Sequence, residues 1–278
     1  MWQSDDWRGF LHPGDLGWHS LVGAEQTAAD LRIWTRDGRV VAIGMLDEPD
    51  LLRMAVDPAA SDDQSIAARI REDLMDASRA VFPPGEAVVE ARGADALQDA
   101  LRAGGWVDDE PWTPLQLPLS EPLDASRLDR ANVRVESVGL DSAEAWIEVH
   151  WSLFQGTPLD DQTRARFTQR WTTMATGPFA HLAQHLIAFD ADHVPVAVTT
   201  VWAAGSGRPG LIEPMGVHRE QQGNGYAVAI TLAGARALQQ SGASSAVVVA
   251  EGSNPGARAT YEASGFVARA PVTDLRLA

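Results

Sequence analysis

The second half of the chain alternates between apolar segments with the period of a strand and apolar segments with the period of a helix. Strand patterns lie at 133–138, 185–190, 194–204, 211–217, 246–250 and 272–277, and helical patterns at 142–154, 160–176, 225–242 and 255–264. A strand places alternate residues on one face, whereas a helix repeats its apolar face about every 3.6 residues. The predicted order is strand, two helices, three antiparallel strands, helix, strand, helix, strand.

The first half repeats the later part of this order. It is predicted to contain a hairpin at 31–46, strands at 51–56, 87–90 and 113–117, and helices at 65–78 and 95–103. The interval from Val56 to Gly105 is 49 positions, and the matching interval from Val217 to Gly265 is 48 positions. Such internal similarity predicts two copies of one fold. We therefore expect an α/β (α+β) protein with domains at 1–120 and 132–278, joined by a polar linker at 121–131.

The formal charge of −16 and the absence of cysteine limit the possible functions. An acidic protein repels the phosphates of nucleic acid and tolerates cationic amines, so nucleic acid is not an expected partner. Without cysteine there is no disulfide, thiolate metal ligand or cysteine nucleophile. All 22 basic residues are arginine, which also excludes Schiff-base chemistry on lysine. The chain has no signal-peptide pattern and no apolar run of about 20 residues, so we expect a soluble, cytoplasmic protein without a membrane partner.

A polar loop with two glycines follows the predicted strand at 211–217 and precedes a helix. Glycine at positions 223 and 225 lets successive backbone N–H groups turn inward without a Cβ clash. Such donors at the N-terminus of a helix bind a pyrophosphate. A Rossmann dinucleotide site is the competing interpretation. However, Val228 stands where its third glycine belongs, and too little chain follows Glu251 to complete a parallel sheet.

Two motifs in this region resemble those of the GNAT acetyltransferase superfamily. The segment 222–227, Gln-Gly-Asn-Gly-Tyr-Ala, is similar to the Gln/Arg-x-x-Gly-x-Gly/Ala signature of that superfamily. The segment 254–266 resembles its second motif, Asn-x-x-Ala-x-x-x-Tyr-x-x-x-Gly-Phe. The resemblance extends over 131–278 and implies a mixed, mostly antiparallel sheet flanked by helices in each of two tandem GNAT-like domains. The tandem arrangement distantly resembles the mycothiol synthases.

The resemblance implies acetyl-CoA as a co-substrate, no metal, and a coenzyme site at particular residues. In the family, the strand before the loop pairs with the pantetheine arm and polarises the thioester carbonyl through a backbone N–H. Here this strand contributes Met215, Gly216 and Val217. The diphosphate is expected on the N–H groups of the loop residues Gln222, Gly223, Asn224, Gly225, Tyr226 and Ala227. Asn254 is expected either to bond the pantetheine or to cap the last helix.

The same resemblance makes Tyr261 the general acid that protonates the departing thiolate. Glu213 is the first choice for the base, because it shares one face of its strand with Met215. Relatives commonly place this glutamate two residues earlier, where the chain has Leu211. Pro214 has no N–H and therefore suits a bulge or a splayed pairing, which re-aims Glu213. The alternatives for the base are Glu251, His218 and an ordered water.

The first half lacks both the glycine loop and the tyrosine. In place of the glycine loop it has three acids, Asp57, Asp62 and Asp63, whose carboxylates oppose the binding of a diphosphate. Leu101 stands at the position that corresponds to Tyr261. We therefore expect a degenerate copy without a coenzyme site, kept as a scaffold or as one wall of the acceptor site.

The expected function is that of an acetyl-CoA-dependent N-acetyltransferase. The acceptor is expected to be the amine of a small molecule or a peptide, which attacks the thioester directly. The alternative is a non-catalytic acyl-CoA-binding module with a regulatory role. Trp146 and His150, on the helix at 142–154, are expected in the core rather than in the acceptor pocket. The pattern leaves open the acceptor, the acyl chain, and whether the protein is a monomer or a homodimer.

Overall fold

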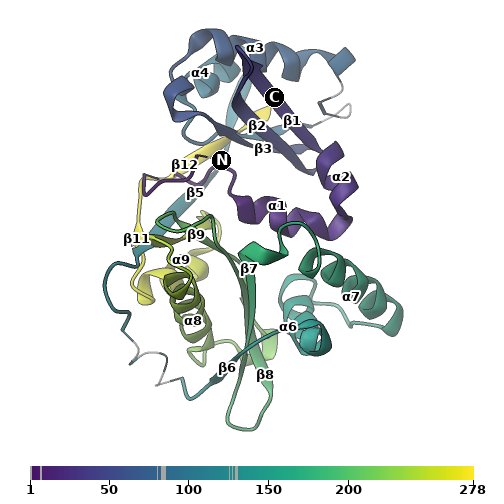
Figure 1. Ribbon diagram of the computed structural model, residues 1–278, viewed down its shortest axis with the longest axis vertical. Coiled ribbons are helices and arrows are strands. Elements are labelled where there is room, and N and C mark those ends of the chain that lie inside the picture. Colours follow the sequence, from purple (N-terminus) through teal and green to yellow (C-terminus); the bar gives the residue numbers. More distant parts are fainter. Residues whose placement is uncertain are drawn as a thin grey trace.

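The first half of the chain forms the upper part of the molecule in Figure 1. The computed structural model describes residues 2–6, 8–79, 81–82, 86–124, 126, 128 and 131–278. The strands of the first half are β1 (Leu31–Arg36), β2 (Arg39–Glu48), β3 (Leu51–Val56), β4 (Val88–Glu90) and β5 (Trp106–Pro118). Its helices are α1 (Pro13–His19), α2 (Ala24–Ala29), α3 (Gln64–Met75) and α4 (Asp95–Ala103), with 3-10 turns at Ser20–Val22, Pro58–Ala60 and Ala77–Arg79. The sequence pattern does not predict α1 and α2. It predicts only residues 113–117 of β5, which is longer in the structure.

The second half follows the predicted order of elements. Its strands are β6 (Arg134–Ser137), β7 (Ala183–Phe189), β8 (Pro195–Trp202), β9 (Gly210–Val217), β10 (Ser245–Glu251), β11 (Val267–Ala268) and β12 (Val272–Leu277). Its helices are α6 (Ala143–Phe154), α7 (Asp161–Ala175), α8 (Tyr226–Gln240) and α9 (Pro255–Ala263), with 3-10 turns at Leu140–Ser142, Ala180–Leu182 and Arg219–Gln221. The mixed, mostly antiparallel sheet with flanking helices is thereby confirmed.

The strands of both halves belong to one sheet. In the described part of the chain the order is β1-β2-β3-β4-β12-β5-β10-β9-β8-β7-β6, and β11 also pairs with β5. The pairs β3–β4 and β9–β10 are parallel, and the other pairs are antiparallel. Main-chain hydrogen bonds therefore join the two halves without a break.

The last strand of each half pairs in the other half, as the yellow β12 in the upper part of Figure 1 shows. The first part of β5 pairs with β12, and from Trp112 onward β5 pairs with β10. Strand β12 also pairs with β4. The side chains follow this exchange, because Leu115 of β5 is buried in the core under α8 and Leu275 of β12 is buried in the core under α3 and α4. Each half therefore contributes its last strand to the part of the sheet that the other half forms.

Two cores lie on opposite faces of the sheet in the second half (Figure 1). Helices α8 and α9 contribute Ile230 and Tyr261 to one core, and α6 and α7 contribute Trp146 and Trp171 to the other. The gap between β9 and β10, described below, is therefore flanked by helices on both faces.

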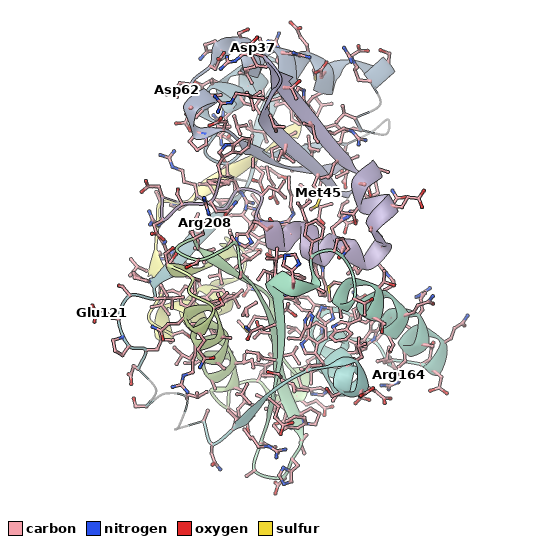
Figure 2. The ribbon with its side chains drawn as sticks, viewed as in Figure 1. Asp37, Met45, Asp62, Glu121, Arg164 and Arg208 are labelled. Carbon is pink, nitrogen blue, oxygen red and sulfur yellow. The ribbon has the colours of Figure 1, made fainter. Side chains whose placement is uncertain are left out.

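Helix α1 connects the first half to the second half by close contact. Two of its glycines face the ring of Trp202 on β8, and a Cβ added at Gly17 would lie only 2.2 Å from that ring. The ring of His12, just before α1, approaches the carbonyl oxygen of Pro209 at 3.1 Å. On the opposite side, Met45 is fully buried beside Leu16 (Figure 2). Helix α1 is thus held between the strands of both halves.

The segment between the halves is only partly described. Strand β5 continues to Pro118 and Leu119 is buried, so the first residues of the polar stretch belong to the fold. Within the predicted linker 121–131, residues 125, 127, 129 and 130 lie outside the described residues. The limits 1–120 and 132–278 stay a prediction. In the described ranges, no helix has the length and apolar character that a bilayer crossing needs.

Candidate active site

The site begins where two parallel strands separate. Strands β9 and β10 pair only through Gly210–Ala246 and Leu211–Val247, although β9 continues to Val217. The N–H of His218 donates to the carbonyl of Val196 on β8. Because successive residues of a strand turn their N–H groups to opposite sides, the N–H groups of residues 215 and 217 point to the open side, away from β8. These are the Met215 and Val217 donors that the sequence predicts for a pantetheine arm.

A bulge interrupts β9 at the predicted position. The register against β8 shifts between Thr199 and Val201, opposite Glu213 and Pro214. Side chains of β8 satisfy the displaced carbonyl groups: the indole N–H of Trp202 donates to the oxygen of Glu213 at 2.7 Å, and the hydroxyl of Thr199 donates to that of Pro214 at 3.0 Å. The bulge therefore fixes the backbone that carries the Glu213 side chain.

The glycine loop after β9 leaves a row of backbone donors free. Gly223 and Gly225 have φ values of 86° and 84°, in the region that favours glycine. Gly225 is the N-cap of α8 and offers no side-chain oxygen to it. Within the described ranges, the N–H groups of residues 222–228 donate to no protein acceptor. Nothing lies within 4 Å of a Cβ placed on either glycine, so the loop is open to a ligand.

A cavity of about 760 Å³ opens at the gap between the strands. The second half contributes Glu213, Met215 and Tyr261 to its lining, together with Asn254 and Glu251. The first half contributes Phe10, Asp15, Trp18, Glu48, Arg53, Glu90, Arg92 and Trp112. The structure thus brings the two predicted catalytic side chains to one cavity, with the first half as its opposite wall.

Burial and nearby charges set the protonation of the two predicted catalytic groups. Burial raises the pKa of the Glu213 carboxyl group, and the guanidinium of Arg53 opposes this effect. Burial also raises the pKa of the Tyr261 hydroxyl, and the Glu213 carboxylate raises it further. Tyr261 therefore keeps its proton at neutral pH. No described residue forms a hydrogen bond with the Tyr261 hydroxyl, so this proton is available to a group in the cavity.

Arg53 stands at the centre of a carboxylate cluster from the first half. Its Nε donates to Asp47 at 2.7 Å, and its Nη1 lies 3.7 Å from both Asp15 and Glu90. Burial raises the pKa of Asp15 to about 8, although Arg53 lowers it. The remaining causes are Glu213 and Glu90, which raise this pKa, and the N–H of His12, which lowers it.

Arg92 has its donors occupied by protein groups. Its guanidinium makes two hydrogen bonds to Asp274 of β12, at 2.7 and 2.6 Å, and one to the carbonyl oxygen of Gly9 at 3.2 Å. It also lies 5.1 Å from the centre of the Trp112 ring. Bidentate pairing with a carboxylate holds a guanidinium in a fixed orientation. Arg92 therefore supports the wall of the cavity and ties β12 to the first half.

His150 of α6 also lines the cavity. Its ring stacks on Trp146 at 5.0 Å and contacts Phe154 at 4.6 Å, and burial lowers its pKa to about 4. It is therefore a neutral imidazole. Its Nδ1 is buried without a hydrogen-bond partner in the described part of the chain. Trp146 lies in the core as predicted, whereas His150 is shared between the core and the cavity.

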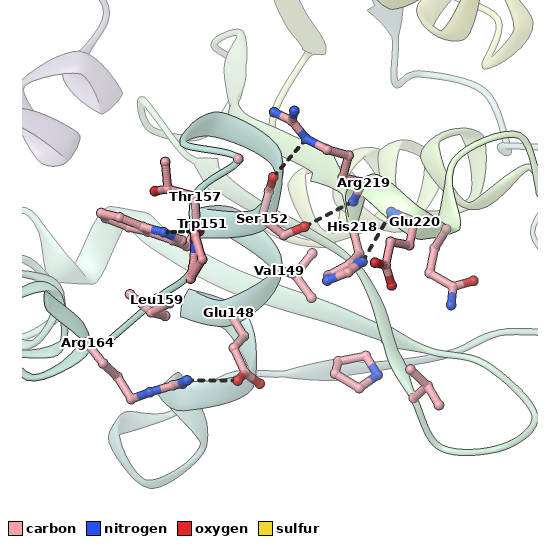
Figure 3. Close-up of a pocket in the computed structure, with 15 residues that line it drawn as sticks. Glu148, Val149, Trp151, Ser152, Thr157, Leu159, Arg164, His218, Arg219 and Glu220 are labelled. Atoms are coloured by element: carbon pink, nitrogen blue, oxygen red, sulfur yellow. Dashed lines mark hydrogen bonds and ion pairs between the residues drawn. The ribbon is translucent and has the colours of Figure 1, made fainter. Parts of the chain in front are cut away.

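The remaining candidates take different places. The Asn254 side chain accepts from the N–H of Ala257 at 3.0 Å, so it caps α9, and it also faces the cavity. Glu251 also lines the cavity. His218, in contrast, lies in a separate cavity of about 730 Å³ beside α6, where its Nδ1 accepts from the N–H of Glu220 at 3.3 Å (Figure 3). None of the residues that line this cavity also lines the larger one.

Figure 3 also shows how the loop is attached to α6. Arg219, two residues after β9, donates to the carbonyl oxygens of Ser152 and Leu153 at 3.2 and 3.0 Å. Lone carbonyl groups at the C-terminal end of a helix favour such a cation. Arg219 thereby fixes the start of the glycine loop against the last turn of α6.

The site residues of the first half have no distinguishing pattern in the sequence. Asp15 lies on α1, a helix of seven residues whose Gly-Asp-Leu-Gly sequence has no clear period. Arg53 and Glu90 are single charged residues in strands, and strands of this kind usually expose such side chains. The only signal for them was the expectation that the first half forms a wall of the acceptor site. No group of three or more metal-ligating side chains was found in the described ranges.

Comparison with known proteins places this site in a family. Residues 143–266 match the model of the acetyltransferase (GNAT) family. This part of the chain is a GNAT-family domain, which confirms the resemblance derived from the two motifs. Among curated proteins, no sequence match to the chain is found.

Solved structures share the fold of the whole chain at low sequence identity. A GCN5-related N-acetyltransferase from Sphaerobacter thermophilus is 17% identical with a TM-score of 0.61, over 96% of this chain and 93% of that chain. A tandem GNAT protein from the clavulanic acid biosynthesis pathway is 16% identical with a TM-score of 0.60, over 93% of this chain and 86% of that chain. A GCN5-related N-acetyltransferase from Kribbella flavida is 17% identical with a TM-score of 0.55, over 94% and 95%. The likeness therefore extends over both halves.

Proposed function

We propose that the protein is an acetyl-CoA-dependent N-acetyltransferase that transfers an acetyl group to the amine of a small molecule or a peptide. The carrying observation is the gap between β9 and β10: Glu213 and Tyr261 line the cavity at this gap, and the glycine loop with its free N–H groups follows the end of β9. An open strand edge, an anion cradle after the same strand and an acid–base pair beside it are the parts that acyl transfer from a coenzyme thioester requires.

The residues of the cradle fit the coenzyme. A diphosphate is bound by unpaired N–H groups at a helix N-terminus, and residues 222–228 present such groups at the start of α8. The outward N–H groups of Met215 and Val217 suit the amide oxygens of a pantetheine arm, because an extended chain can add to an open strand edge. When bound, acetyl-CoA supplies an acyl carbon that is activated as a thioester.

The side chains at the gap divide the proton transfers between them. Glu213 accepts a proton from the acceptor nitrogen, directly or through a water, as a new C–N bond forms. A carboxylate whose pKa is raised by burial is a stronger base than an exposed one. The C–S bond breaks, and Tyr261 gives its proton to the departing sulfur. A backbone N–H at the edge of β9 stabilises the negative charge on the carbonyl oxygen meanwhile.

The absence of cysteine makes the decisive assay simple. The chain contains no thiol, so a thiol-reactive dye reports only coenzyme A that the reaction releases. We expect acetyl-CoA and a panel of primary amines to release thiol in an enzyme-dependent manner. Glu213→Gln should reduce the turnover by about 10²-fold or more, the usual contribution of a positioned base. Matched Glu251→Gln distinguishes the two candidate glutamates, and we expect it to retain most of the turnover.

The same assay tests the alternative of a regulatory acyl-CoA-binding module. That module would bind acetyl-CoA stoichiometrically in calorimetry and release no thiol with any amine. Tyr261 favours the enzyme, because a proton donor without an internal partner has no evident task in a protein that only binds the coenzyme. Coenzyme binding without turnover across the panel would therefore contradict the proposed activity while preserving the coenzyme site.

A further inference from the structure

The cavity beside Glu213 and Tyr261 has an excess of negative side chains. Five carboxyl groups line it against two guanidinium groups. The carboxyl groups are those of Asp15, Glu48, Glu90, Glu213 and Glu251. Both guanidinium groups are engaged: Arg92 pairs with Asp274 and lies 3.6 Å from Glu90, and Arg53 pairs with Asp47 and lies 3.7 Å from both Asp15 and Glu90. The carboxyl groups of the lining therefore outnumber its cations, and the described residues that line the cavity include no free cation for an anionic group.

The buried carboxyl groups of the cavity come from both halves of the chain, not only from the strand that carries Glu213. Asp15 and Glu90 come from the first half, and their side chains are only 9% and 5% exposed. Glu213 comes from the second half, beside the strand gap. A carboxylate held away from water is costly unless a cation accompanies it. Arg53 and Arg92 together face four carboxyl groups, those of Asp15, Asp47, Glu90 and Asp274.

Aromatic rings and one unpartnered nitrogen complete the lining. Phe10, Trp18, Trp112 and Phe154 line the same cavity. Flat apolar rings beside carboxylates suit the carbon chain and the charged end of an organic ammonium ion. His150 is 7% exposed, it also lines the cavity, and its Nδ1 has no protein partner among the described residues. A buried polar atom of this kind marks a place where a ligand or a water supplies the missing hydrogen bond.

We propose that the acceptor is a primary amine that carries a second positive charge, such as a diamine. Its reacting nitrogen lies between Glu213 and Tyr261, its second cation is held by Asp15 and Glu90 of the first half, and its carbon chain lies against the aromatic rings. This inference rests on the proposed acetyltransferase function and names the substrate class for the same site. It also gives the first half a binding role in place of its lost coenzyme site.

Protonation should couple to binding. Burial raises the pKa of Asp15 to about 8, so this carboxyl group is largely protonated in the empty cavity at neutral pH. The groups that face it are Arg53 on β3, Glu90 on β4, Glu213 on β9 and the N–H of His12. A second cation in the cavity favours the charged carboxylate and releases its proton. Selectivity for a dication should therefore increase as the pH rises through 8.

Three acceptors with five carbon atoms each test the proposal with the unmodified protein. Pentane-1,5-diamine carries a second cation, pentylamine carries none, and 5-aminopentanoic acid carries an anion instead. We expect kcat/KM for the diamine to exceed that for pentylamine by at least about tenfold, which is the effect of about 1.4 kcal/mol. The amino acid should be the poorest of the three. Equal values for diamine and monoamine, or a preference for the amino acid, would overturn the proposal and leave the acetyltransferase function standing.

Binding measurements keep the outcome independent of turnover. Calorimetry on the protein saturated with coenzyme A should show the diamine binding at least tenfold more tightly than pentylamine, with proton release that only the diamine produces at pH 7. Equal affinities would overturn the inference even if no amine is acetylated. If no amine releases thiol but the diamine binds selectively, the proposed function fails and the cation site survives.

Variants locate the second cation. Asp15→Asn and Glu90→Gln preserve side-chain volume and remove the charge, and each should reduce the ratio of diamine to pentylamine efficiency by about tenfold. Asp192→Asn, an exposed turn residue outside the cavity, is the matched control and should leave the ratio unchanged. Thermal unfolding checks that each variant is folded. A ratio that stays constant in both folded cavity variants would assign the second cation elsewhere and contradict the placement.

Discussion

The helices that follow the corresponding strands β3 and β9 begin in opposite ways. At the start of α3, the Asp63 carboxylate accepts from the N–H groups of Ser65 and Ile66 at 3.0 and 3.1 Å and pairs with Arg36. At the start of α8, Gly225 has no side chain, and the N–H groups around it meet no acceptor in the described residues. One half fills an anion site with its own carboxylate, whereas the other leaves it for a ligand.

The strands before these helices, β3 and β9, also differ in how far they pair with their parallel neighbours. The parallel pairing of β9 with β10 ends at Leu211, six residues before the end of β9. The pairing of β3 with β4 continues to Arg53, three residues before the end of β3. Arg53 and Glu90, the last pair in this register, also form an ion pair at 3.7 Å. The unpaired end of β3 is thus shorter than that of β9, and the last paired residues, Arg53 and Glu90, line the cavity of the second half.

The largest expected effect on activity comes from comparing Tyr261 of α9 with Leu101, which stands at the corresponding position of α4. Tyr261 of α9 lies at the cavity, while Leu101 at the corresponding position of α4 is fully buried beside Leu97. We expect Tyr261→Phe to reduce kcat by about 10²–10⁴, the usual span for a positioned acid, with little change in coenzyme affinity. Leu101→Met, a substitution that preserves volume, should retain the wild-type kcat. Steady-state assays with several acyl donors check both, and the loss should shrink for donors whose thiol leaves more readily.

A matched pair of glycine variants tests the cradle. Gly225 and Gly38 have φ values of 84° and 75°, and neither has an atom within 4 Å of an added Cβ. Valine should therefore strain the backbone similarly at both positions. We expect Gly225→Val to weaken acetyl-CoA binding by more than about 30-fold, or 2 kcal/mol, while Gly38→Val retains wild-type affinity. Calorimetry measures both; a loss smaller than about threefold in Gly225→Val would show that the loop does not hold the diphosphate.

The count of coenzyme sites is a smaller but sharper test of the comparison. We expect one acetyl-CoA per chain, because the carboxylate of Asp63 occupies the N–H groups at the start of α3 that a diphosphate would need. Titration calorimetry gives this stoichiometry directly. Two equivalent sites would mean that the first half retains a working cradle, and the contrast between α3 and α8 would then have no functional meaning.

Sequence periodicity predicts the elements well but not their partners. The alternation at 272–277 fixes which face of β12 is buried, and it is satisfied equally beside the strands of either half. Nothing local in that pattern indicates that Leu275 belongs to the core of the first half. The length of β5 hides the exchange in the same way, because polar residues at Asp108 and Asp109 interrupt its apolar pattern before the segment that pairs with β10.

The candidate site was predictable only where a motif specifies the backbone. The glycine loop and Tyr261 follow from spacing along the chain, because one helix and one turn set their geometry. Asp15, Arg53 and Glu90 become neighbours only through the packing of α1 between the halves and the pairing of β3 with β4. Their charges have no local pattern, and their meaning arises from burial, which the sequence does not display.

The smallest expected effect concerns the carboxylate that fills the anion site of the first half. The N–H of Ile66, then Arg36, hold the pKa of Asp63 below its usual value. A folded-state pKa below the unfolded one stabilises the protein above the unfolded pKa, and this contribution disappears as the pH falls through the folded value. Asn is also a good N-cap, so Asp63→Asn removes the charge and keeps the cap. We expect a Tm slightly below wild type at pH 7 and a difference that vanishes toward pH 3, as measured by calorimetric unfolding. Asp192→Asn should show no such convergence.

Acetyl-CoA should raise the Tm of the Asp63→Asn variant by the same amount as it raises that of the wild type, because the first half has no glycine loop to receive a diphosphate. An additional increase in the variant would mean that this carboxylate alone blocks a second site.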